Sequence, residues 1–382
     1  MKKVLAFVLI GVVALGCGAA YAVAGSQTDP LISLSYLTGT YIPSVLAQAG
    51  DRVDAETQKV YDASKARLDE QHQVNLAQAG GEEGESFAGG LNDRRYKQVD
   101  AISLATGSVA MLLAGRVTVS YAGGAVVDLT AGTTVPSGTD LTAMHRYLAA
   151  ENTTAVVSVS SETAVLSLEG RTSFSPSGAT DYNELAGALK KMGLFAGTGT
   201  GYGEGYDLEK TPTRVEGLIM FLRLIGEEKA AQAYTGACPF VDVPDWCARY
   251  VAYAYSKGYA AGVGPNAQGQ PAFAPLRSIG AGEYLTFVMR ALGYRDSGEN
   301  TDFTWQTVLP RARELGIITE GEYRMLCTSG LVRAHVAYLS YFALDAQRKE
   351  GGTLLEYLGA AGALDLSAVN EVRNQVLVTR IT

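Results

Sequence analysis

The stretch CPFVDVPDWCARYVAYAYSKGYAAGVG, from Cys238 to Gly264, decides how the second half of the chain is organised. It opens with a proline-containing turn and continues as an aromatic, alanine-rich helical pattern that stops at Gly258. A glycine at that point supplies the left-handed conformation that closes a helix. Two further stretches have the same form, DYNELAGALKKMGLF and DFTWQTVLPRARELGI. We therefore expect this region to consist of repeats.

A second helical pattern follows each of these stretches after a loop. The three read TRVEGLIMFLRLIG, GAGEYLTFVMRALG and VRAHVAYLSYFAL. Each is apolar over a broad face, which predicts that the helices bury together. We expect residues 181–344 to form one all-α domain of three helix-loop-helix units around a shared core, not three separate beads.

The second repeat resembles the S-layer homology domain most closely. FVDVPDW is similar to the opening signature of that family, and AYAYSKGYAAGV to its first helix and turn. AFAPLRSIGAGEYLTFVMRALGY resembles the closing stretch, where the family usually carries Ile-Thr-Arg-Ala-Glu. The resemblance divides residues 179–348 into repeats over about 179–232, 237–296 and 300–346. It implies a non-catalytic protein, anchored non-covalently to a Gram-positive wall, that binds anionic secondary cell-wall polysaccharide.

The motif equivalent in the first repeat is Thr213-Arg214-Val215-Glu216. Thr213 and Glu216 have the spacing of a capping box, so both have a structural role. Arg214 is expected to point outward at the first helical position, beside free backbone N–H groups. A planar guanidinium there can bind two oxygens of a carboxylate. The resemblance implies that Arg214 contacts the polymer, whose pyruvate ketals each offer a carboxylate; plain solvated surface is the alternative.

The other two repeats depart from this motif. Repeat 2 has Gly280-Ala281-Gly282-Glu283 and no arginine, whereas repeat 3 keeps Arg333 without the capping pair. For Arg333 the surface interpretation is favoured over polysaccharide binding. Trp246 is expected in the core, with a sugar platform as the alternative, and Asp242 is expected to cap or turn the chain before Pro244. Either one or two grooves hold the polymer, or the repeats have drifted into a structural role.

The region before the repeats has a different periodicity. From about Tyr96 to Phe174 apolar and polar residues alternate between turn signals, which predicts a small all-β domain over residues 96–178. His145 within it is interpreted as structural. The partner of this β-domain is unknown. The whole chain is thus expected to be a multidomain α+β protein.

The remaining segments connect or flank these two domains. Residues 25–95 are expected to hold a short docking segment (29–48), an exposed polar helix or weak coiled coil (51–78) and the flexible linker GGEEGESFAGGLNDRR (80–95). Residues 349–382 are expected to be a C-terminal tail.

The first 24 residues have the order of a secretory signal peptide. Lys2 and Lys3 precede an apolar run, and small residues lead to cleavage after Ala22 or Ala24. A lipoprotein is the alternative, because Cys17 follows Ala14-Leu15-Gly16. We expect a secreted protein at the cell wall, without a membrane segment after cleavage. Losing the two lysines takes the net charge from -8 to -10, which argues against nucleic acid as a partner.

Three cysteines remain after such cleavage, namely Cys238, Cys247 and Cys327. An odd number leaves one unpaired, while Cys238 and Cys247 could form a disulfide across the turn. No zinc spacing occurs, so no metal or cofactor is predicted.

No catalytic motif is apparent in the sequence. The glycine-rich stretch GTGTGYGEG (197–205) lacks the lysine of a phosphate loop, and no nucleophile elbow occurs. We therefore predict that the protein is not an enzyme. The alternatives are a secreted wall hydrolase built from distant carboxylates, or an envelope scaffold that binds its partner through the β-domain.

Overall fold

The computed structural model describes residues 36–78 and 85–382. The predicted signal peptide, and residues 29–35 of the predicted docking segment, lie outside the described residues. The chain divides into two parts, one up to Gly80 and the other from Gly81 onward. None of the described helices is long and apolar enough to cross a membrane.

In the first part, the described residues 36–78 form a single long helix. A π-helical turn, η1 (Leu37–Tyr41), leads into α3 (Ile42–Gln78). Residues 36–70 are all exposed, so the prediction of an exposed polar helix is confirmed for residues 51–70. Local pairs support it, with the Gln58 amide donating to Asp62 and Lys59 to Glu56. The prediction of a docking segment is wrong for residues 36–48, which are helical and exposed. Pro43 lies in the first turn of α3, where a proline is tolerated.

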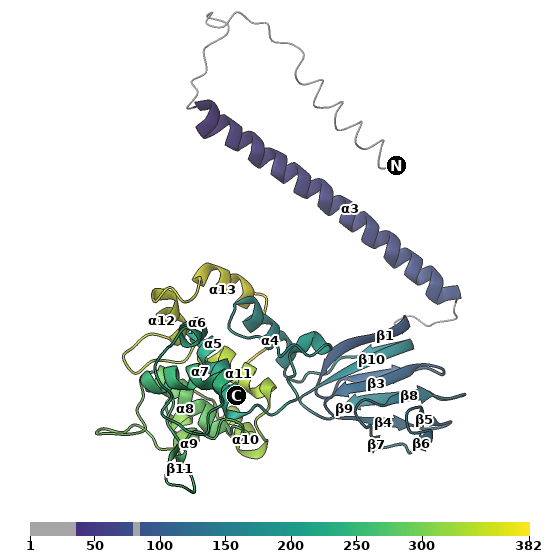
Figure 1. Ribbon diagram of the computed structural model, residues 1–382. Coiled ribbons are helices and arrows are strands. Elements are labelled where there is room, and N and C mark those ends of the chain that lie inside the picture. Colours follow the sequence, from purple (N-terminus) through teal and green to yellow (C-terminus); the bar gives the residue numbers. More distant parts are fainter. Residues whose placement is uncertain (1–35, 79–84) are drawn as a thin grey trace, which may run out of the picture. The chain divides into compact units, whose positions relative to one another are not determined.

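The described residues of the second part begin with a nearly closed antiparallel sheet, which makes the protein mixed α+β (Figure 1). The main strand order is β6-β5-β8-β3-β10-β2-β9-β4-β7, and β1 pairs with β10. Alternate side chains such as Val117, Val119, Val157 and Val159 fill its core, as the period of two predicts. The strands are β1 (Glu85–Lys97), β2 (Ala101–Leu104), β3 (Val109–Ala114), β4 (Val117–Tyr121), β5 (Val126–Asp128), β6 (Thr133–Val135), β7 (Thr139–Asp140), β8 (Arg146–Ala149), β9 (Ala155–Val159) and β10 (Thr163–Ser175).

Strand β10 holds this sheet together because it changes partner along its length. It pairs with β3 through Val165–Glu169 and with β2 through Thr172–Ser175. Gly170 lies between these segments with φ +93°, and a Cβ there would lie 2.9 Å from the Ser108 Cα. Only glycine satisfies both constraints.

The predicted flexible linker is wrong over residues 85–95, which belong to β1. The main chain of this strand pairs with β10, and the register shifts between Ala88 and Asn92, where Gly89 and Gly90 lie. A strand that pairs with one neighbour needs backbone hydrogen bonds more than apolar side chains. Its glycine-rich, charged composition therefore gave no strand signal.

The second half of the chain is helical and has one shared core, which includes buried residues from Tyr182 to Leu358. This confirms a single domain instead of three beads. Gly193, Gly258 and Gly316 close the first helices with φ of +75°, +74° and +70°, as predicted. The elements are α4 (Tyr182–Lys191), η2 (Gly203–Gly205), α5 (Arg214–Leu224), α6 (Glu228–Gln232), α7 (Asp245–Ser256), β11 (Gly264–Pro265), β12 (Pro271–Ala272), α8 (Ala281–Ala291), α9 (Val308–Glu314), α10 (Glu320–Thr328), α11 (Arg333–Ala343), α12 (Leu354–Ala360) and α13 (Leu366–Arg373).

Two pairs of units dock through the same main-chain hydrogen bonds. At the start of α5, the N–H groups of Arg214 and Val215 donate to carbonyls of the second unit, Arg277 O at 2.7 Å and Pro275 O at 3.0 Å. At the start of α11, Arg333 and Ala334 donate likewise to the first unit, each at 2.9 Å, to Lys210 O and Leu208 O. The third unit departs from helix-loop-helix, because α10 lies between α9 and α11.

The predicted C-terminal tail is wrong as a separate segment, since residues 349–382 pack on the helical core. Leu354 and Leu358 are buried in it. Near the end of the chain, Arg380 donates to both carboxylate oxygens of the fully buried Glu322 and to Ile317 O. The Ile381 N–H donates to the Tyr338 hydroxyl at 2.8 Å. Widely spaced apolar residues conceal this docking from sequence analysis.

Replacing Arg380 with alanine is expected to destabilise the protein by about 2–3 kcal/mol, because the buried Glu322 carboxylate loses a charged partner. Urea denaturation followed by circular dichroism measures this change. Arg324→Ala is the control, since its side chain is 73% exposed and its removal should leave the free energy of unfolding nearly unchanged. Equal free energies of unfolding for both variants would contradict the proposal that Arg380 holds the C-terminal segment on the helical core.

Candidate functional site

The candidate site is a groove of about 610 Å³ in the helical domain. The start of α5, the turn after α7, the loop before α8 and α8 itself form most of its wall. Its charged side chains are three arginines, Arg214, Arg277 and Arg290, and two carboxylates, Glu283 and Asp296. Trp305, from the third unit, also lines it and is 78% exposed. The groove thus gathers residues from all three units.

Arg214 lies in this groove but does not point outward as predicted. The capping box is present: the Glu216 N–H donates to the Thr213 hydroxyl, and the Thr213 N–H to the Glu216 carboxylate. The side chain of Arg214 instead enters the second unit, and the residue is only 6% exposed. The first turn of α5 docks on the loop before α8. The face of α5 that was expected to meet solvent is therefore buried inside the domain.

The guanidinium of Arg214 has partners from the second unit. One terminal nitrogen donates to Glu283 at 2.5 Å and the other to Ala261 O at 3.0 Å. Its central carbon lies 4.7 Å from the ring centre of Phe273 and 5.7 Å from that of Phe287. Burial lowers the pKa of Arg214, and the Glu283 charge opposes that shift. A buried cation with these contacts joins two units.

Arg333 occupies the equivalent position between the third and first units. The preferred surface interpretation is wrong, because Arg333 is 5% exposed. It donates to Tyr206 O at 3.1 Å and to Ala196 O at 3.2 Å, and its guanidinium lies 5.4 Å from the ring centre of Phe195. Ala196 and Ala261 each stand three places after a helix-closing glycine, so the two arginines make matching contacts.

Glu283 lies between two arginines, Arg214 and Arg277, and its carboxylate pairs with both of their positive charges. Arg277 donates to both of its oxygens, at 2.5 and 3.1 Å, in addition to the bond from Arg214. Burial alone would raise the pKa of Glu283, but the Arg277 and Gly280 hydrogen bonds and the two arginine charges outweigh it, so this pKa lies below its usual value. A second pair joins Arg290 to Asp296 at 2.6 and 2.9 Å. Three cations therefore face two anions.

Arg277 is the cation most accessible to a ligand, because its side chain is 49% exposed. Sequence reasoning missed Arg277, Arg290 and Trp305. One signal in the sequence could have identified Arg277. It lies just before Gly280-Ala281-Gly282-Glu283, the motif of repeat 2 that lacks its own arginine. The open guanidinium edge and the exposed indole can together contact an anionic, ring-containing ligand.

The two other predicted binding residues do not line the groove. Trp246 is 59% exposed at the start of α7, so its expected core position is wrong. Asp242 accepts from the N–H groups of Phe273 and Ala274, at 2.8 and 2.7 Å. This carboxylate fixes the loop that leads to Arg277, and thus acts on the groove through the backbone.

The helix starts of the second and third units keep part of the capping arrangement. Glu283 accepts from the Gly280 N–H at 3.1 Å. In the third unit, His335 Nδ1 accepts from the Val332 N–H at 3.4 Å. Repeat 3 lacks the capping pair, as the sequence indicated, and an imidazole nitrogen there takes the place of the carboxylate in the return bond.

The possible disulfide between Cys238 and Cys247 is not formed. Cys247 is buried, and its thiol donates to Pro244 O at 3.4 Å. Burial raises its pKa to about 11. Cys238 is partly buried and Cys327 is exposed, both as free thiols. The turn thus directs Cys247 into the core.

Comparison with known proteins does not extend this description. Neither a protein-family model nor a curated protein matches the chain. Within residues 36–78 and 85–382, no group of three or more His, Cys, Asp or Glu side chains is arranged to hold a metal ion. The function must be inferred from the groove and its charges.

Replacing Glu283 with glutamine should make the free energy of unfolding depend less on pH in the acid range. Since the pKa of Glu283 is lowered by folding, its contribution is present above its usual value of 4.5 and is lost as the pH falls through the folded value. The stability difference between wild type and Glu283→Gln should therefore be largest near pH 7 and shrink below pH 4.5. Denaturation series from pH 7 to 3 test this, with Glu350→Gln, at an 80% exposed side chain, as the control. A difference that stays constant with pH would refute it.

The thiols should differ in their rates of reaction with a disulfide reagent. A thiol with a pKa of about 11 is almost fully protonated at pH 8, and the thiolate is the reactive form. In the native protein Cys327 should react first and Cys247 last. Stopped-flow labelling of Cys327→Ser and Cys247→Ser assigns the phases, and a fast phase missing from Cys247→Ser would contradict the burial of that thiol.

Proposed function

We propose that this protein is a non-catalytic component of a Gram-positive cell envelope that holds an anionic secondary cell-wall polysaccharide in the groove between its first and second units. The observation that carries the proposal is the excess positive charge beside an exposed tryptophan. Arg277 keeps half of its side chain open although it bonds Glu283. Trp305 offers an indole face for a sugar ring.

The chemistry of the groove favours a carboxylate-bearing glycan. A guanidinium fork matches a carboxylate in geometry, and a pyruvate ketal presents one carboxylate on a sugar. The overall charge of -8 would repel such a polymer. A local arginine must therefore attract it, and the groove supplies the half-exposed Arg277. The resemblance of the repeats to S-layer homology domains supports the same ligand class.

Only one of the two equivalent positions has a cation open to a ligand. Arg333 is enclosed by the carbonyls of Ala196 and Tyr206 and by Phe195. Arg214 is enclosed as well, but Arg277 stands beside it. We therefore infer one principal polysaccharide site, with Arg214 and Arg333 acting as structural links between units.

Arg277→Ala should weaken binding to purified wall fragments by about ten-fold to a hundred-fold, the equivalent of about 1.5–3 kcal/mol for a lost charge-assisted bond. Arg277→Lys should recover part of this loss, because lysine keeps the charge but not the fork. Trp305→Ala should weaken binding too. Co-sedimentation at low and raised salt measures each effect, and salt should weaken the wild type.

The matched control is Arg324→Ala, a surface arginine on α10. Circular dichroism must show that each variant is folded. Wall binding that survives in a folded Arg277→Ala, Trp305→Ala double variant would move the search to the β-domain. Clearing of wall in an activity gel would instead support the hydrolase alternative.

A further inference from the structure

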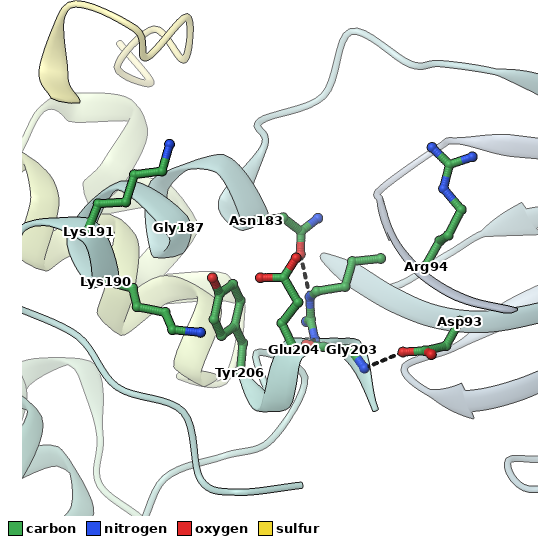
Figure 2. A pocket seen from close by; sticks show the side chains of 10 residues that line it. Asp93, Arg94, Asn183, Gly187, Lys190, Lys191, Gly203, Glu204 and Tyr206 are labelled. Carbon is green, nitrogen blue, oxygen red and sulfur yellow. Dashed lines mark hydrogen bonds between the residues drawn. The ribbon is translucent and has the colours of Figure 1, made fainter. Parts of the chain in front are cut away.

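A second pocket, of about 680 Å³, lies where β1 of the sheet meets α4 and η2 of the helical domain (Figure 2). It shares no lining residue with the groove around Arg277. Four cationic residues line it, two from each domain: Arg94 and Arg95, and Lys190 and Lys191. Such a cluster stands out in a chain with a net charge of -8.

Arg95 forms the fixed floor of this pocket. Its guanidinium donates to Asn183 Oδ1 at 2.7 Å, to Gly203 O at 3.1 Å and to Glu209 at 2.5 Å. These bonds use its charge and also orient the Asn183 amide. Because the amide oxygen accepts from Arg95, its NH₂ group is left to donate to a ligand.

The other three cations form no salt bridge within the described residues. Within the described residues, Arg94, Lys190 and Lys191 have no carboxylate oxygen within 4 Å. The Lys190 ammonium instead lies 4.9 Å from the ring centre of Tyr206, and Figure 2 shows it directed at that ring. Arg94 and Lys191 are exposed, so both can reorient toward a bound group.

Two carboxylates oppose these charges. Asp93 accepts from the Gly203 N–H at 2.6 Å, which ties it to the loop. Glu204 has a φ of +56°, and Figure 2 shows its carboxylate near Asn183 and Tyr206. Four positive and two negative side chains therefore line the pocket, and Glu204 is the anion that a negative ligand would meet.

We propose that this pocket binds phosphate groups. Its available donors are the Lys190 and Lys191 ammonium groups, the Asn183 amide and the exposed Arg94 guanidinium, while the Arg95 guanidinium is already used by protein groups. Ammonium groups act as point charges without a planar fork, which suits a tetrahedral oxyanion with several oxygens better than a flat carboxylate. The two sites thus differ in chemistry, one for carboxylates at Arg277 and one for phosphates at the junction of the domains.

The test is calorimetric titration of the full chain, at low salt, with orthophosphate and separately with a short glycerol phosphate oligomer. Binding of orthophosphate alone would identify free phosphate as the ligand, and binding of the oligomer would identify a phosphodiester polymer. The Lys190→Ala, Lys191→Ala double variant should bind about ten-fold more weakly. Glu204→Gln should bind several-fold more tightly, because it removes the opposing charge.

Lys257→Ala is the matched control, since the Lys257 ammonium also lies over a tyrosine, 5.5 Å from the ring centre of Tyr253, outside the pocket. It should bind phosphate as the wild type does. Absence of phosphate binding by the wild type, an equal loss in Lys257→Ala, weaker binding by Glu204→Gln, or equally tight binding of acetate would each overturn the proposal. Wall co-sedimentation of the lysine double variant should be unchanged with phosphate-free glycan, so failure here and failure of the groove can be told apart.

Discussion

The burial of the Arg214 guanidinium between the first and second units is the constraint on which the helical domain depends. A charge removed from water is costly unless it is paired and hydrogen-bonded. Here Glu283, Ala261 O and two aromatic rings supply those contacts. Arg333 is buried between the third and first units, where two carbonyls and the ring of Phe195 hold it without a carboxylate partner. The helical units are therefore joined by two buried arginines whose polar partners lie within an apolar core.

This constraint moves the proposed binding site away from the motif arginine. A motif arginine that joins units cannot also present its fork to solvent. Glu283, which neutralises Arg214, accepts from Arg277 as well, so one carboxylate serves two cations. The surplus charge remains on Arg277, outside the motif and half exposed. The proposed binding at the groove thus depends on a pairing that also determines how the units dock.

The sheet and the helical domain retain separate apolar cores, and charged groups connect them. Glu209 accepts from Arg95 of β1 and from Thr163 of β10, so one carboxylate of the helical domain holds two neighbouring strands. This connection orders the residues around the second pocket. Its cations come from both domains, and docking of the domains is what gathers them.

Local features could be read directly from the sequence. The helix-closing glycines, the Thr213–Glu216 capping box, the exposed helix over 51–70 and the alternation in β4 and β9 each depend on residues close together in the chain. Strand β1, the docking of Arg380, the inward direction of Arg214 and the gathering of Arg277 with Trp305 were decided by tertiary structure alone. Each depends on which distant segment packs against it: β10 gives β1 its partner, Glu322 holds the C-terminal segment, and the second unit encloses Arg214. Sequence patterns report the preference of a residue for its own helix or strand, whereas burial of a charge is determined by the neighbour that covers it.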